Sequence, residues 1–350
     1  MSNNSESTVD VEEDSLLEND SFTEEQYVER VERDIEKAGK EFKRKSALSE
    51  SSQQERKKRL QSWNVAIDIV KQFRPVPSSV WRLIYQVFGR ENGLTESTPL
   101  SFHTVKLLIT KAAQDETLAI NHAKPDGIDI KAPSYKLTKA VMDIGIDVAA
   151  ACCYLHAISR RIDSLVDERI WHPLVDDALL RAKIGHFVGG TLPQFGYGRG
   201  MLAGFSGRAG LVIQIATGTK KQCTRALEHM ARGVPMRNVC FKIYGCDPLE
   251  VAAISLVASG CGRDSALGIA GASMKNNTVV SDPNQFLWLA VTSLVEHLRM
   301  GTPSEVDEKC WNAFGYSDKR RKDIIETIRR LQRKKHGWNW ITLTQSAMEV

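Results

Sequence analysis

Residues 201–214 read Met-Leu-Ala-Gly-Phe-Ser-Gly-Arg-Ala-Gly-Leu-Val-Ile-Gln, and the rest of the chain is organised around them. The stretch is mostly apolar or small and contains no proline, so it predicts a buried helix that ends near residue 216. Gly204, Gly207 and Gly210 recur at steps of three and predict one smooth face against which other helices pack closely. Arg208 is the one ionisable side chain of the stretch. It either pairs with a carboxylate inside the protein or faces a partner.

The segments on either side also predict helices. Apolar side chains recur at helical spacing around this stretch, whereas no segment keeps the period of two that marks a strand. The expected helices are 80–88, 104–119, 135–156 with a turn near residue 145, 167–187, 222–231, 249–259, 265–272, 284–299 and 317–335. Residues 188–200 are expected to form a Gly/Pro loop, and Pro173 is expected in the first turn of its helix, where proline is tolerated. The predicted class is all-α.

Charge and composition divide the chain into four parts. Residues 1–22 are rich in acids and poor in large apolar groups, so we expect a disordered acidic tail. Residues 23–72 carry two apolar stripes on charged helices, a charged helical extension that could pair internally, pack on the main domain or form an oligomer. Residues 73–275 form the main helical domain. Residues 276–350 supply closing helices and a basic tail.

Bulk properties narrow the function classes. A formal net charge of +4 is too mild to imply nucleic-acid binding by itself. No signal peptide or membrane-length apolar run is visible, and the seven cysteines show no CxxC pair. We therefore expect a cytoplasmic protein with buried, reduced thiols and no membrane partner.

Five short motifs occur in a fixed order. They are a proline-marked helix start at 73–88, a Leu-Thr-Lys-Ala-Val-Met-Asp-Ile-Gly-Ile turn at 137–146, Trp-x-x-Leu-Val-x-x-Ala at 171–178, Leu-Ala-Gly-Phe-Ser-Gly-Arg-Ala-Gly-Leu at 202–211 and Tyr-Gly-Cys-Asp-Pro-Leu-Glu-Val-Ala-Ala at 244–253. As an ordered set, they resemble the HDOD domain, the HD-related output domain of bacterial signalling proteins. The resemblance covers residues 73–275 and implies a multi-helix HD-like bundle.

The resemblance also implies where metal ligands would stand. The related HD phosphohydrolases bind metal through a His, a His-Asp pair and a further Asp. Here the first His position falls on Pro173, the pair falls on Gly207 and Arg208, and a later His position falls on Pro248. Proline and glycine side chains have no donor atom, and arginine keeps its positive charge. We therefore expect no enzyme activity, no metal and no other cofactor.

A site displaced by one residue is an alternative. His172 and Asp176 are spaced i, i+4 on one predicted helix, and Asp247 precedes Pro248. Together they would offer an imidazole and two carboxylates to a metal. One residue along a helix rotates a side chain by about 100°. The alternative reading is that His172 and Asp176 are an ordinary surface or capping pair.

Basic residues suggest two further contacts. Arg199 lies in a glycine-rich segment at 196–200 and could join Arg208 in holding an anion, although no strand precedes the segment as a dinucleotide loop requires. The last predicted helix carries cations followed by two tryptophans, a pattern that suits a phosphate backbone or another anionic partner. Its candidate contacts are Arg329, Arg330, Arg333, Lys334 and Lys335. The leading hypothesis is a non-catalytic signalling protein that binds another protein, with a nucleic-acid or anion-binding regulator second and a residual phosphohydrolase third.

Overall fold

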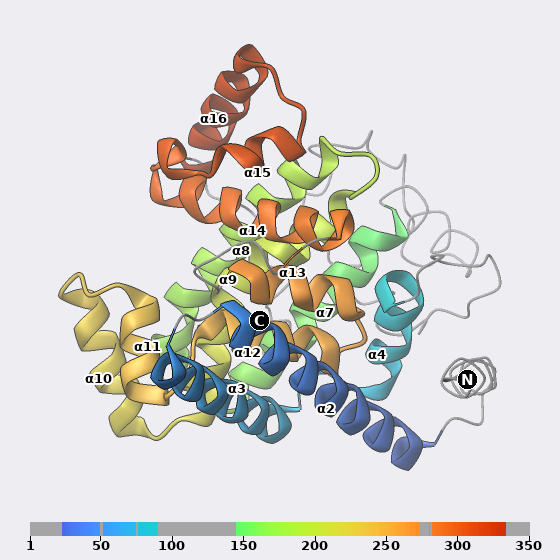
Figure 1. The fold of residues 1–350 in the computed structure, drawn as a ribbon, viewed down its shortest axis with the longest axis vertical. Coiled ribbons are helices and arrows are strands. Elements are labelled where there is room, and N and C mark those ends of the chain that lie inside the picture. The colour runs from blue at the N-terminus through green and yellow to red at the C-terminus, as the bar shows by residue number, and fades with distance from the viewer. Residues whose placement is uncertain are drawn as a thin grey trace, which may run out of the picture.

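The computed structural model describes residues 23–49, 52–74, 76–89, 145–272, 280 and 282–333. Within those ranges every regular element is a helix, which confirms the all-α prediction (Figure 1). None of the helices in the described part is long and apolar enough to cross a lipid bilayer. The helix expected at 104–119 lies outside the described residues, as do residues 1–22, Lys334 and Lys335.

The centre of the fold is α9 (Tyr197–Thr217), packed along α8 (Glu168–Gly190). Two glycines of α9 permit close approach to two different helices. A Cβ on Gly204 would lie 2.2 Å from the carbonyl oxygen of Arg181 in α8, and one on Gly210 would lie 1.7 Å from that of Pro248. Around Gly207 the nearest atoms would be 3.6 Å away or more. The expectation of one smooth glycine face is therefore wrong, because the three glycines meet three different surroundings.

The α8–α9 connection is shorter than expected. Residues 191–196 form it, because α8 continues to Gly190 and α9 begins at Tyr197, so the loop predicted at 188–200 is too long. Gly189 and Gly200, which were expected in the loop, lie in α8 and α9 where the two helices contact each other. Pro173 lies well inside α8, not in its first turn, so the carbonyl of residue 169 loses the N–H partner it would have in a regular helix.

The N-terminal extension forms α2 (Glu24–Ser49) and α3 (Gln53–Phe73). Their apolar stripes are buried: Phe42 lies against Trp63 with ring centroids 4.9 Å apart, and Val70 is fully covered. Both helices pack on α12 (Pro248–Ala258), and their buried residues belong to the same hydrophobic cluster as α8 and α9. These stripes are therefore used within the chain.

Glu250 of α12 ties this extension to the core. It is fully buried, accepts a hydrogen bond from the Ser62 hydroxyl, and forms an ion pair in which Arg59 Nη1 lies 3.1 Å from Oε1. Burial outweighs these favourable contacts and raises the pKa of Glu250 to about 7. The α3–α12 contact therefore contains a carboxyl group that titrates near neutral pH.

Shorter helices complete the bundle. They are α4 (Ser78–Ile84) with a π-helical turn (Tyr85–Gly89), α7 (Ile146–Asp163), α10 (Lys220–Ala231), α11 (Met236–Tyr244), α13 (Arg263–Ala272), α14 (Pro283–Met300), a 3₁₀ turn (Pro303–Glu305), α15 (Glu308–Ala313) and α16 (Asp318–Arg333). Neither α11 nor α15 was predicted, because they have nine and six residues and too few turns for a clear periodicity. All seven cysteines are buried and free.

Candidate functional site

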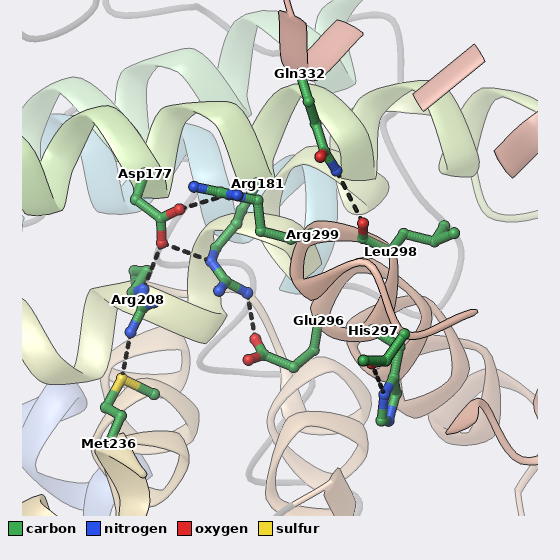
Figure 2. Close-up of polar contacts among 10 residues, drawn as sticks. Asp177, Arg181, Arg208, Met236, Glu296, His297, Leu298, Arg299 and Gln332 are labelled. Carbon is green, nitrogen blue, oxygen red and sulfur yellow. Dashed lines mark hydrogen bonds and ion pairs between the residues drawn. The ribbon is translucent and has the colours of Figure 1, made fainter. Parts of the chain in front are cut away.

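Asp177 of α8 is the centre of a cluster of charged side chains from three helices (Figure 2). Its Oδ2 accepts hydrogen bonds from Arg181 Nε at 2.8 Å and from Arg208 Nε of α9 at 2.5 Å. Its Oδ1 accepts from Arg299 Nε of α14 at 2.7 Å. One carboxylate thus binds three guanidinium groups and connects α8 to α9 and α14.

Glu296 supplies the second carboxylate of the cluster. It lies one turn before Arg299 on α14 and accepts from Arg181 Nη1. Arg181 is 1% exposed, and its Nε and Nη1 bind Asp177 and Glu296, whereas its Nη2 is buried without a hydrogen-bond partner among the described residues. Burial of Asp177 alone would raise its pKa, but the charges and hydrogen bonds of Arg181 and Arg208 hold the pKa well below its usual range. Asp177 is therefore a permanent anion at any physiological pH.

Arg208 faces into the protein. Its Nη1 lies 2.6 Å from the sulfur of Met236, the first residue of α11, while its Nε binds Asp177. Its side chain is 19% exposed. Of the two readings of Arg208 left open by the sequence, the structure shows pairing with an internal carboxylate.

None of the four positions at which the resemblance implies a metal ligand carries a side chain that can bind a metal ion. Pro173 is inside α8, and Gly207 lies on α9 beside Arg181 and Glu296. Pro248 opens α12, where a missing N–H costs nothing because first-turn amides have no intrahelical partner. Arg208, next to Gly207 on α9, carries a permanently charged guanidinium. A divalent cation does not fit this set, because the guanidinium of Arg208 already binds the Asp177 carboxylate and that of Arg181 binds Glu296.

The displaced metal site is not assembled either. Asp247 is buried as the N-cap of α12, where its Oδ1 accepts from the Leu249 N–H at 2.9 Å and its Oδ2 from Arg237 Nε at 2.7 Å. His172 packs edge-on against Trp171, with ring centroids 4.8 Å apart, and Asp176 is exposed. Among the described residues, no group of three or more His, Cys, Asp or Glu side chains could hold a metal ion.

Solved structures share this architecture. An HDOD domain protein of unknown function from Geobacter sulfurreducens matches with a TM-score of 0.54 at 14% identity, over 81% of this chain and 99% of its own. A "putative phosphohydrolase" from Shewanella amazonensis matches with a TM-score of 0.51 at 13% identity, over 80% and 98% of the two chains. The chain has the HDOD fold. No protein-family model and no curated protein matches the sequence.

A third match on the HDOD fold carries a name from signalling. The "putative signal transduction protein" from Marinobacter aquaeolei has a TM-score of 0.52 at 13% identity, over 81% of this chain and 67% of its own. At such low identities the matches establish the arrangement of helices and do not transfer an activity. The function must therefore be argued from the residues of this chain.

The glycine-rich segment on this HDOD fold is a helix start. Gly196 is the N-cap of α9, and the Gly198 N–H donates to Asp147 Oδ2 at 2.7 Å, so a carboxylate of the chain already occupies the helix N-terminus. Arg199 is nine residues before Arg208 on the same helix, or about 14 Å along its axis. Its Nη1 lies 3.4 Å from the carbonyl oxygen of Gln194. The structure therefore does not bring Arg199 and Arg208 together around one anion.

The basic side chains of α16 point outward. Arg329, Arg330 and Arg333 are exposed, whereas Ile324 and Ile328 are buried. Arg330 pairs with Glu326 at 3.2 Å. Gln332 donates to the Leu298 carbonyl at 2.8 Å, which fixes the end of α16 on α14 (Figure 2). The helix thus presents a fixed, cationic outer face.

Sequence reasoning missed most of the cluster. Asp177, Arg181, Glu296 and Arg299 were not among the candidate residues. The i, i+4 spacing of Asp177 and Arg181 was a usable signal, because an acid and a base at that spacing face each other on a helix. Nothing local indicates Glu296 and Arg299, which lie more than a hundred residues further along the chain.

Proposed function

We propose that this protein is a non-catalytic regulatory protein of the HDOD type that acts in signalling by binding another protein. The observation that carries the proposal is the Arg208–Asp177 contact at 2.5 Å. Arg208 stands at one of the two positions where the resemblance implies a metal ligand pair, and its guanidinium binds the Asp177 carboxylate of α8. Arginine stays protonated and accepts no hydrogen bond, so it can neither bind a metal nor act as a general base.

Two further observations support a role in binding. The charged cluster joins α8, α9 and α14, so it fixes the relative positions of three helices and keeps the surface they present constant. The free, buried cysteines suit a reducing compartment, and the three structures that share the fold come from bacteria. The proposal therefore places the protein in a bacterial cytoplasm.

An activity assay tests the non-catalytic part. Purified full-length protein is incubated with a chromogenic phosphodiester and with cyclic dinucleotides, in Mn²⁺ and in EDTA, beside an active metal-dependent phosphodiesterase. We expect identical, background hydrolysis in both conditions. Mn²⁺-dependent turnover that scales with protein concentration would overturn the proposal, and its loss in His172→Ala would assign it to the displaced site.

A binding assay tests the regulatory part. Proteins that co-purify with the full chain are identified by mass spectrometry, and each candidate is purified and titrated against the chain. We expect one-to-one binding by at least one purified candidate. If every candidate fails to bind in isolation, a role through protein–protein contact is removed.

Nucleic-acid or anion binding through α16 is the second candidate function. The exposed Arg329, Arg330 and Arg333 favour it, because guanidinium groups bind phosphate in bidentate fashion. Binding to a labelled duplex is measured between low and physiological salt in the full chain and in a triple Arg→Gln variant of these positions. Affinity that falls steeply with salt and is lost in the variant would support this function. Absent or salt-insensitive binding would remove it.

A further inference from the structure

A cavity of about 800 Å³ lies where the N-terminal extension meets the main bundle. It is bounded by the first turns of α2, the end of α3, the start of α4 and the C-terminal half of α7. Cavities that bind small organic ligands measure about 300–1,000 Å³. The space is therefore large enough for a ligand of that class.

One part of the cavity is apolar. Its wall is built from α2 side chains at helical spacing and from residues that flank the α3–α4 connection. The main contributors are Tyr27, Val31, Ile35, Val70, Val76 and Val80. The Tyr27 hydroxyl donates to the Val76 carbonyl at 2.6 Å, so this polar group is already satisfied. This region offers contact to a hydrocarbon or aromatic body and few hydrogen bonds.

The opposite part is cationic. Arg74 caps the end of α3, and Arg160 and Arg161 lie in the last turn of α7. Arg161 Nε donates to the Phe73 carbonyl at 3.0 Å, which joins the two helix ends. Among the described residues, the side chains of Arg74 and Arg160 have no ion pair or hydrogen bond. Glu24 and Glu32 are the acids in the lining, against these three arginines and Lys71.

The backbone at Arg74 is unusual. Its φ of 49° is in the left-handed region, where no other non-glycine residue of the described chain lies. Glycine is the usual residue at such a helix end, because a side chain there costs conformational free energy. Helix C-termini do attract cations, which accounts for basic side chains on α3 and α7. That attraction does not explain an arginine in a strained position that borders a cavity.

We propose that this cavity binds a small amphipathic anion. The apolar body of the ligand lies among the side chains of α2, α3 and α4. Its carboxylate or phosphate head lies between Arg74 and Arg160, which provide charge-assisted hydrogen bonds. Because α2 and α3 form one wall and α7 the other, the ligand stabilises the extension on the bundle. This site is separate from the Asp177 cluster.

Titration calorimetry on the full chain tests the proposal. The probes are decanoate and decyl phosphate, both kept below micelle-forming concentrations, with decanol and decyltrimethylammonium as neutral and cationic counterparts. We expect one-to-one binding of at least one anion, and weaker binding of decanol by tenfold or more, since a hydrogen bond between charged groups is stronger than one to a neutral hydroxyl. Binding of decanoate alone identifies a carboxylate head, and binding of decyl phosphate alone identifies a phosphate head.

Variants locate the binding. Arg74→Gly removes the guanidinium and relieves the backbone strain, so it leaves the fold intact, and we expect at least a tenfold loss of anion affinity. Arg160→Gln should produce a similar loss. Arg329→Gln removes an equal charge from the distant α16 and should leave the affinity unchanged. No anion binding, equal binding of decanol, or equal affinity in Arg74→Gly and Arg329→Gln would each overturn the proposal.

Discussion

Asp177→Asn tests how much the charged cluster contributes to the stability of the fold. It keeps the size of the side chain and removes the negative charge that three arginines share. The amide can accept through one oxygen only, so at least one guanidinium loses its partner. Arg181, at 1% exposed, then keeps Glu296 as the one carboxylate of the two that it contacts in wild type.

The expected cost follows from the burial of the partners. Removing one member of a buried ion pair costs about 3–5 kcal/mol. Here the Asp177 side chain is 15% exposed, and Arg208 and Arg299 are 19% and 34% exposed, so water can reach part of the cluster. We therefore expect the free energy of unfolding to fall by about 2–4 kcal/mol.

The stability difference between wild type and Asp177→Asn should depend on pH. The folded-state pKa of Asp177 is lowered, so the folded protein keeps the charge in acid, whereas the unfolded chain takes up a proton near the usual value of about 4. The stability that wild type holds over Asp177→Asn should be complete above about pH 5 and should shrink as the pH falls below about 4.

Urea unfolding followed by circular dichroism provides the measurement, with Asp176→Asn as the control. Asp176 is the exposed neighbour of Asp177 on α8, and its substitution should change the free energy of unfolding by about 0.5 kcal/mol or less. Equal costs for the two variants would refute the reasoning, and so would a difference that grows in acid.

Two other substitutions test the packing and the buried carboxyl of α12. Gly210→Ala should destabilise the fold by about 3 kcal/mol or more, because its Cβ would lie 1.7 Å from the Pro248 carbonyl oxygen. Gly207→Ala should be neutral or stabilising by up to about 1 kcal/mol, because its Cβ would meet no atom closer than 3.6 Å. Equal melting temperatures of the two variants would contradict this expectation. Because the folded-state pKa of Glu250 is raised to about 7, wild type should lose stability relative to Glu250→Gln as the pH rises from about 4.5 to about 7, by on the order of a few kcal/mol. Parallel curves of stability against pH for the two proteins would contradict the raised pKa.

Local patterns predicted the helices because the pattern and the packing agree. Residues 201–214 are buried nearly throughout, so their apolar composition alone identified the central helix. The stripes through Phe42 and Val70 likewise matched their buried faces. The prediction failed where a residue type is common in two kinds of structure, as glycine is in loops and in close helix contacts. Glycines at 189 and 200 read as loop formers, but they lie where α8 and α9 touch, which only the partner helix reveals.

The charged cluster could not be predicted in the same way. Asp177 and Arg299 are 122 residues apart, and their contact depends on how α14 crosses α8. Arg208 was singled out because it stands at an unexpected position, but its sequence neighbours did not name its partner. Through the resemblance, the sequence thus predicted positions without metal-binding side chains, whereas the charged side chains around Asp177 depend on the positions of three helices.

A titration of the full chain with Mn²⁺, followed by electron paramagnetic resonance, tests the central claim most directly. If the arginine–carboxylate cluster has replaced a metal centre, the signal of free hydrated Mn²⁺ should grow in proportion to the added metal, with no site tighter than about 100 µM. Saturable uptake of one Mn²⁺ per chain at low micromolar concentration, lost in His172→Ala, would contradict the claim.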